Sequence, residues 1–172
     1  MNCDTARQTR LPGPYGEVGE AQLDGKRVHF LAMDLVEGRT LRRVLADGGP
    51  VPEPLLREIA LQAARGLAAL HGAGVVHRDL KPDNLLLTHD RRIRITDLGV
   101  AKVPEGSASV TIAGHFVGSP AYASPEQCAN RAVGPSADLY SLGAVLYELA
   151  SGRPPFDAHR WCMARRDLAD HA

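Results

Sequence analysis

Apolar residues recur along the chain at two spacings, and the first spacing predicts strands. Residues 27–36 alternate in a way that places apolar side chains on both faces, which is typical of a strand buried on both sides. The DGK turn at 24–26 predicts a hairpin whose partner strand is residues 16–23. We therefore predict a two-stranded ribbon at the start of the chain.

The second spacing predicts helices. Thr40 is a suitable N-cap for a short helix, which the GGPVPEP segment ends. Residues 53–71 carry apolar side chains at helical spacing, and glycines follow them. The segment 136–152 is apolar nearly all round and ends at Gly152, so we expect a helix buried in the centre of its unit.

Two short strands complete this pattern. Residues 84–87 and 92–96 are apolar runs joined by a polar turn, which indicates a hairpin between the long helix and the last helix. A stretch rich in Gly, Ser and Thr follows, to about residue 125. The order of elements predicts an α+β fold that is mainly helical in its larger part.

Composition narrows the class of protein. A chain of 172 residues with 44% hydrophobic content suits one globular fold, and its 20 basic and 20 acidic residues cancel. This balance argues against nucleic acid or an anionic membrane as the main partner. The longest apolar stretch, 142–150, is too short to span a bilayer, and no leader pattern opens the sequence. Three widely spaced cysteines predict neither a disulfide framework nor a zinc cluster, which favours the cytoplasm.

The densest group of polar residues is HRDLKPDN at 77–84. Asp79 is a candidate base, Lys81 a cation two positions later, and Asn84 a neutral oxygen ligand; Asp97 follows the second short strand. Any one of them alone is more often a turn or cap residue. Together they can hold a phosphoryl group and a hard cation such as Mg²⁺, which prefers oxygen ligands.

Four motifs carry a resemblance to a known family. HRDLKPDN, then DLG at 97–99, GSPAYASPEQ at 118–127 and DLYSLGAVLYELASGRPPF at 138–156 occur in that order. They resemble the C-lobe of a bacterial serine/threonine protein kinase of the eukaryotic (Hanks) type. The resemblance covers roughly residues 16–156. It implies transfer of the γ-phosphoryl group of ATP to a Ser or Thr of a protein substrate.

The resemblance also implies a role for each matching residue. Asp79 would orient the substrate hydroxyl as the base, and Lys81 would meet the transferred phosphate. Asn84 and Asp97 would hold Mg²⁺. Ser119 stands where the family usually has a Thr that contacts the Asp and the Lys.

Nucleotide binding and domain limits follow in the same way. The backbone of Asp34 and Val36 would face adenine, and Leu86 is assigned to the same nucleotide site. Residues 1–36 would be residual N-lobe strands and a hinge. Residues 37–172 would be a partial C-lobe with the catalytic loop, activation segment and central helix.

Regulation is expected to involve the activation segment. Arg78 resembles the residue that clamps a phosphorylated activation loop, and Thr111 is the expected site of that phosphate. Glu126 resembles the glutamate that pairs with an arginine farther along the family's sequence. An active sister kinase would be the enzyme that modifies Thr111.

The glycine cluster GPYGEVG at 13–19 is not expected to bind phosphate. The family places its glycine-rich loop much farther ahead of HRD than these glycines lie, so they are interpreted as turn residues. The strand lysine and helix glutamate are also not found before the hinge, and Lys26 lies in a turn. We therefore expect a truncated kinase with very low activity alone, in need of a complementing lobe. The alternative is a catalytically silent, pseudokinase-like binding module or gene remnant.

Overall fold

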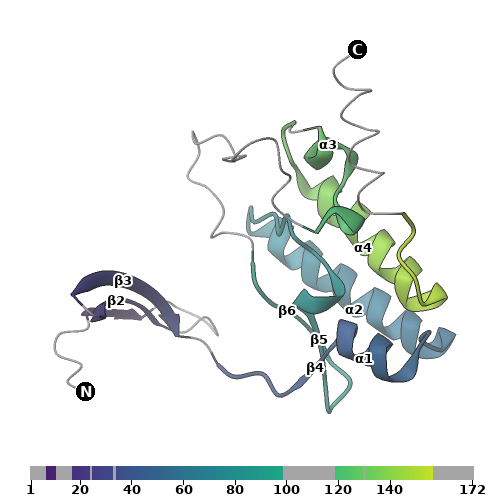
Figure 1. The fold of residues 1–172 in the computed structure, drawn as a ribbon, viewed down its shortest axis with the longest axis horizontal. Coiled ribbons are helices and arrows are strands. Elements are labelled where there is room, and N and C mark those ends of the chain that lie inside the picture. The colour runs from purple at the N-terminus through teal and green to yellow at the C-terminus, as the bar shows by residue number, and fades with distance from the viewer. Residues whose placement is uncertain are drawn as a thin grey trace. The chain divides into compact units, whose positions relative to one another are not determined.

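The computed structural model describes residues 7–10, 17–23, 25–32, 34–98, 119–129 and 131–156. The chain divides into two compact units, Met1–Glu37 and Gly38–Ala172, and each is described by itself. Figure 1 shows the elements of both units along the sequence. The predicted phosphorylation site Thr111 lies outside the described residues.

The first unit contains an antiparallel sheet of order β1-β2-β3. Strand β2 (Glu17–Leu23) pairs with β3 (Lys26–Ala32) from Glu17 opposite Ala32 to Leu23 opposite Lys26, which confirms the predicted hairpin. Gly25 takes the positive φ of 74° that this tight turn requires. Strand β1 (Arg7–Arg10) adds a third strand, so the prediction of only two strands is wrong. Its sequence, RQTR, has no apolar residue to mark it.

Burial along β3 also differs from the prediction. Val28 and Phe30 are partly buried, whereas Ala32 is exposed. The polar residues Arg27 and His29 between them are exposed as well. Among the described side chains of β3, one face is therefore partly buried at Val28 and Phe30 and the other is exposed, so these residues are not buried on both sides.

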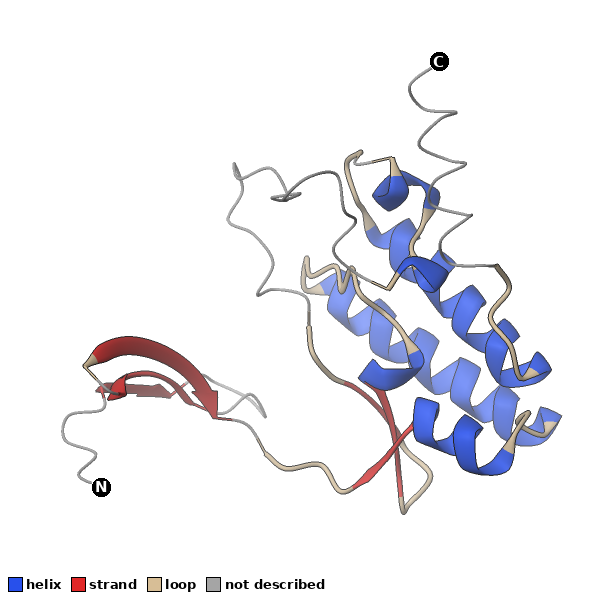
Figure 2. Cartoon of the chain, in the orientation of Figure 1, coloured by secondary structure: helices blue, strands red, loops and turns tan. Residues whose placement is uncertain are grey.

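Three helices of two turns or more dominate the described part of the second unit (Figure 2). They are α1 (Leu41–Gly48), α2 (Glu53–Gly72) and α4 (Pro135–Ser151). The hydroxyl of Thr40 accepts a hydrogen bond from the backbone N–H of Arg43 at 3.2 Å, which confirms the predicted cap. Gly152 ends α4 in the left-handed conformation at φ 79° and donates to the carbonyl of Glu148.

A second small sheet lies beside the helices. Strands β4 (Gly38–Thr40), β5 (Leu85–Thr88) and β6 (Ile93–Ile95) form it in that order, all antiparallel. The β5–β6 hairpin confirms the two predicted short strands. β4 was not predicted, and it requires glycine at its start, because a Cβ on Gly38 would lie 2.7 Å from the carbonyl oxygen of Leu87.

The core of this unit lies where α2 packs against α4 and β6 (Figure 1). Its buried apolar residues are Leu41, Val51, Ile59, Ala63, Leu67, Leu80, Leu85, Tyr122, Leu142, Ala144, Val145 and Leu149. Each fully buried Leu or Val contributes about 1.5–3 kcal/mol relative to an exposed one. The expectation that α4 is buried all round is wrong. Its outer face leaves Leu139 and Tyr147 about half exposed, because the described elements pack on one side of the helix.

Two short 3₁₀ turns and one short helix are the remaining elements among the described residues of the second unit. They are η1 (Pro82–Asn84), η4 (Pro120–Tyr122) and α3 (Pro125–Cys128). Cys128 in α3 is buried. Within the described ranges, we find no helix with the length and apolarity that crossing a membrane requires.

Candidate active site

The polar segment 77–84 leaves the end of α2 and leads into β5, and a buried carboxylate holds its first two residues. Asp138 on α4 is fully buried. One carboxylate oxygen accepts from the backbone N–H of His77 and the other from that of Arg78, both at 2.8 Å. His71, near the end of α2, lies 2.8 Å from Asp138 through Nε2. The first two residues of the segment are therefore hydrogen-bonded to a carboxylate that is buried in the core.

His77 itself is a buried, hydrogen-bonded core residue. Its Nε2 lies 2.9 Å from the carbonyl oxygen of Thr96, and its Nδ1 accepts from the backbone N–H of Asp79 at 3.3 Å. The imidazole thus joins the segment to the end of β6. Both ring nitrogens are engaged by backbone groups, which fixes the orientation of the ring.

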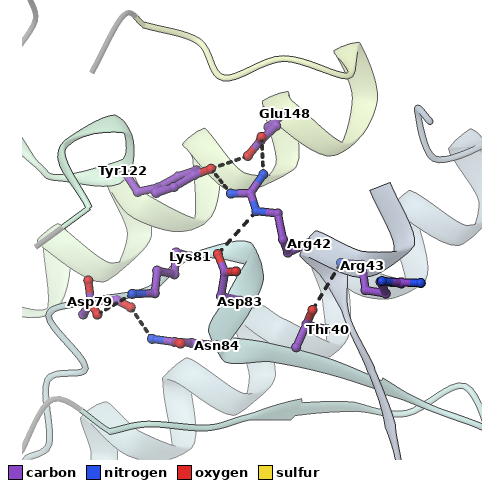
Figure 3. A network of polar contacts seen from close by, with 9 residues as sticks. All are labelled: Thr40, Arg42, Arg43, Asp79, Lys81, Asp83, Asn84, Tyr122 and Glu148. Carbon is purple, nitrogen blue, oxygen red and sulfur yellow. Dashed lines mark hydrogen bonds and ion pairs between the residues drawn. The ribbon is translucent and has the colours of Figure 1, made fainter. Parts of the chain in front are cut away.

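Three of the predicted site residues lie together in this segment (Figure 3). Lys81 Nζ lies 3.1 Å from Asp79 Oδ2, and each side chain keeps a fifth to a quarter of its surface exposed. Asn84 is buried and donates from Nδ2 to the backbone carbonyl of Asp79 at 2.8 Å. The structure therefore brings a carboxylate, an ammonium and an amide to one place.

Asp97 lies at the same end of the β5–β6 hairpin as Asn84. The carbonyl oxygen of Asn84 accepts from the backbone N–H of Thr96 at 2.9 Å and from its hydroxyl at 3.3 Å. Asp97 follows directly, with an exposed side chain and a positive φ of 53°. A non-glycine residue in this region costs about 1 kcal/mol, and such strain is concentrated at functional sites.

A second polar network lies beside the segment and joins four elements (Figure 3). Arg42 on α1 donates to Glu148 of α4 at 2.7 Å, to the hydroxyl of Tyr122 at 2.5 Å and to Asp83 at 3.4 Å. The Tyr122 hydroxyl also donates to Glu148, at 2.5 Å. Asp83 belongs to η1, so the network reaches the 77–84 segment from outside.

The pKa values of this network report its burial and pairing. Burial, followed by the hydrogen bond to Glu148, raises the pKa of Tyr122 to about 12. Burial acts to lower the pKa of Arg42, but hydrogen bonds to Glu148 and Tyr122 outweigh it and raise the pKa above its usual value. The arginine is therefore charged at every physiological pH.

The other predicted site residues are placed as follows. Asp34 and Val36 belong to the first unit and Leu86 to β5, where it pairs with Thr40 and Arg94. Ser119 precedes η4, and its carbonyl accepts from Tyr122 at 3.1 Å. Glu126 is partly buried in α3 and accepts through its carbonyl from Arg131 at 2.8 Å. The side chain of Arg78 is exposed.

Sequence reasoning missed several residues that build the site. Asp138 and Glu148 are acidic residues inside an otherwise apolar helical segment, and burying such groups costs free energy unless they are paired. That contrast was a signal that they have polar partners. Nothing in the spacing of Arg42 or Tyr122 identified those partners, because the contacts span 106 and 26 positions.

The donor chemistry fits a hard cation. The Asn84 amide nitrogen is committed to the Asp79 carbonyl, which leaves its side-chain oxygen as the available ligand atom. Asp97 presents an exposed carboxylate at the same end of the hairpin. One amide oxygen and one carboxylate suit Mg²⁺, which completes its shell with phosphate and water. No cluster of three or more His, Cys, Asp or Glu suited to a metal occurs within the described ranges, so a site saturated by such side chains is not indicated there.

Comparison with known proteins establishes the family. The model of the protein kinase domain matches residues 19–169, and the chain belongs to this family. The chain is 42% identical over 127 residues to the serine/threonine-protein kinase PknL of Mycobacterium tuberculosis, covering 74% of this chain and 32% of the relative. It is also 36% identical over 140 residues to the serine/threonine-protein kinase PknB of Mycobacterium leprae, covering 81% and 22%.

These findings confirm the resemblance to bacterial serine/threonine protein kinases and the α+β kinase-like fold. The family generally uses ATP and Mg²⁺ and acts on protein substrates. The chain spans about a fifth to a third of the length of the curated relatives it matches.

Proposed function

We propose that the chain carries the phosphoryl-transfer site of a serine/threonine protein kinase. The observation that carries the proposal is the Asp79–Lys81 pair at 3.1 Å, on a segment whose backbone is fixed by the buried Asp138. Positioning and electrostatics supply most of the acceleration in this reaction. A base and a cation held close together by the core meet that requirement.

In the proposed reaction, Asp79 accepts the proton of a substrate Ser or Thr hydroxyl. The hydroxyl oxygen forms a bond to the γ-phosphorus of ATP, and the bond from that phosphorus to the bridging oxygen breaks, which leaves ADP. Lys81 offsets the negative charge of the transferred group. The Lys81 ammonium lies 3.1 Å from the Asp79 carboxylate, so the cation and the proton acceptor would act at the same place.

Asn84 and Asp97 would hold Mg²⁺, which supplies positive charge against the phosphates when it is bound. Asp34, Val36 and Leu86 would contact the nucleotide. Residues 1–36 would be N-lobe strands and a hinge, and residues 37–172 would be a partial C-lobe. The expected cytoplasmic location belongs to it as well, since the reaction consumes ATP.

The proposed regulation rests on the exposed Arg78. Its guanidinium is available to a phosphate on Thr111, because five donors in a planar group suit phosphate oxygens. Ser119 would contact the Asp79–Lys81 pair, and Glu126 would fix the segment that follows. The proposed partners are a protein substrate, an active sister kinase that modifies Thr111, and a complementing lobe.

The test is transfer of labelled γ-phosphate from ATP to a generic basic protein. The sequence analysis does not find the strand lysine that binds the nucleotide phosphates. The assay therefore has two arms, without and with a lobe that supplies this lysine. One contains the chain alone, and the other contains the chain with the isolated N-terminal lobe of the PknL relative. Each arm includes an Asp79→Asn control. Gel filtration is used to check that the lobe and the chain associate in the second arm.

We expect transfer to Ser or Thr in the second arm and its loss in Asp79→Asn, with the first arm near its control. Loss of one preorganised contact removes about two to three powers of ten in rate, so the chain alone should be about 10⁴-fold or more slower than a complete kinase. Associated proteins that bind Mg·ATP but show no Asp79-dependent transfer would overturn the proposal in favour of a binding module.

A further inference from the structure

Gln127 in α3 uses both ends of its side-chain amide. Its Oε1 accepts from the backbone N–H of Ser124 at 3.0 Å, while the Ser124 hydroxyl accepts from the backbone N–H of Gln127 at 3.4 Å. This is a capping box at the start of the short helix. The other end, Nε2, points away from the cap and donates to the carbonyl oxygen of Arg78 at 2.6 Å.

Nε2 binds the carbonyl of the peptide between Arg78 and Asp79, and the N–H of that same peptide is hydrogen-bonded as well. The carbonyl of Arg78 and the N–H of Asp79 belong to the same planar peptide. That N–H donates to His77 Nδ1 at 3.3 Å, while the carbonyl accepts from Gln127. The plane that leads into Asp79 is therefore fixed on both edges, one by an imidazole and one by an amide.

Arg78 needs this support because its backbone is strained. Its φ is 67°, in the left-handed region that a residue with a Cβ rarely adopts. The cost is of order 1 kcal/mol, and such a conformation persists only where the surroundings impose it. Asp138 holds the N–H of Arg78, and Gln127 holds its carbonyl, so the strained residue is bound on both sides.

We infer that Gln127 is a positioning residue for phosphoryl transfer. It fixes the peptide between Arg78 and Asp79, and this keeps the Asp79 carboxylate beside Lys81. The role rests on the proposed function, because Asp79 is the proposed base. Gln127 touches neither the substrate nor the nucleotide in this role; it acts through the backbone of Arg78.

The competing explanation is that Gln127 serves only the cap of α3. Two substitutions separate the two roles. In Gln127→Glu the carboxylate still accepts from Ser124, as in the common form of the capping box, but it has no hydrogen to donate to Arg78. In Ser124→Ala the hydroxyl side of the cap is lost, while the Gln127 amide still reaches Arg78. The first variant tests positioning and the second is its matched control.

The measurement is hydrogen exchange at the Asp79 amide, followed by NMR on the whole chain and expressed relative to the core amide of Val145. We expect about tenfold faster relative exchange in Gln127→Glu, which corresponds to the loss of one hydrogen bond to a strained peptide. Ser124→Ala should stay within about twofold of the wild type. Gln127→Met loses both the donor to Arg78 and the acceptor for Ser124, so it should exchange at least as fast as Gln127→Glu; it serves if the carboxylate prevents folding.

The kinetic readout uses the arm of the transfer assay that contains the N-terminal lobe. We expect kcat to fall about tenfold in Gln127→Glu with KM for ATP unchanged, because the hydroxyl acceptor is displaced and the nucleotide ligands are not. Equal exchange and equal kcat in Gln127→Glu and Ser124→Ala would overturn the inference. If the wild type transfers no phosphate, the proposed function fails. Hydrogen exchange at the Asp79 amide then decides by itself whether Gln127 fixes the peptide between Arg78 and Asp79.

Discussion

Two polar networks hold the 77–84 segment, and they bind different parts of it. Asp138 binds the main chain, since its two oxygens accept from the backbone N–H groups of His77 and Arg78. Arg42 binds side chains, since it pairs with Glu148, Tyr122 and Asp83. The first network is fully buried at its carboxylate, whereas the arginine of the second is partly exposed.

The difference separates two structural tasks. A carboxylate that accepts from consecutive backbone N–H groups determines the conformation of the segment itself. A guanidinium that links α1, η4 and α4 determines how those elements pack around it. Substitutions in the first network should therefore disturb the Asp79–Lys81 geometry, while substitutions in the second should reduce stability and leave that geometry largely intact.

The largest effect is expected for Asp138→Asn. The amide presents N–H hydrogens toward a backbone N–H donor, so one buried donor loses its acceptor and two donors face each other. Breaking a buried charged interaction of this kind costs about 3–5 kcal/mol. Urea unfolding measures the loss. A loss of less than about 1 kcal/mol would show that the carboxylate does not anchor the segment.

Arg42→Met should come next. It leaves the carboxylate of Glu148, 5% exposed, without its cation, and we expect a loss of about 3 kcal/mol in the free energy of unfolding. Adding Glu148→Leu should recover most of this loss, because the double variant no longer buries an unpaired charge. A double variant as unstable as the single one would contradict this explanation.

Tyr122→Phe removes the hydroxyl that joins Arg42 to Glu148 and should cost about 1 kcal/mol at neutral pH. The pH dependence gives a sharper signature. The folded-state pKa is raised from 10.0 to about 12, so the folded protein keeps this proton while the unfolded chain loses it. The stabilisation is fully present below pH 10 and is lost as the pH rises toward 12.

This pH effect is measured as a difference between two proteins. The stability of the wild type relative to Tyr122→Phe should fall by roughly 1–2 kcal/mol between pH 10 and pH 12. Taking the difference removes the contribution of other groups that titrate in the same range. A difference that stays constant across this range would mean that the Tyr122 proton is not held by folding.

The smallest effect is expected for Asp47→Asn on α1. Asp47 pairs with Arg39 at 2.7 Å and with Arg43 at 3.0 Å, but all three side chains are well exposed. Exposed pairs contribute about 0.2–1 kcal/mol each, so the loss in stability should not exceed about 1 kcal/mol and should shrink in high salt. A larger loss that does not depend on salt would show that this surface pair carries more than screened electrostatics.

These expectations also show which parts of the molecule its sequence could predict. The caps at Thr40 and Gly152 and the two hairpins depend on neighbouring residues, so local patterns were sufficient. The grouping of Asp79, Lys81 and Asn84 was equally local, since five positions separate its ends. The assignment to protein kinases followed from motifs in a fixed order.

The rest depends on contacts between distant positions. Arg42 reaches Glu148 across 106 positions, and Gln127 reaches Arg78 across 49, and no periodicity records such pairs. β1 was missed because its pairing with β2 does not require apolar side chains. α4 was predicted to be buried in the centre of its unit because apolar residues lie nearly all round it. Leu139 and Tyr147 nevertheless remain about half exposed.

The central claim is that the core holds the 77–84 segment in place before any nucleotide binds. Native-state amide exchange in the nucleotide-free chain tests it most directly. The amides of His77 and Arg78 should exchange as slowly as that of Val145 in the core, because both are bound to the buried Asp138. The turn amide of Arg91, which donates to Thr88 on the surface, should exchange much faster. Exchange at His77 and Arg78 as fast as at Arg91 would contradict the claim.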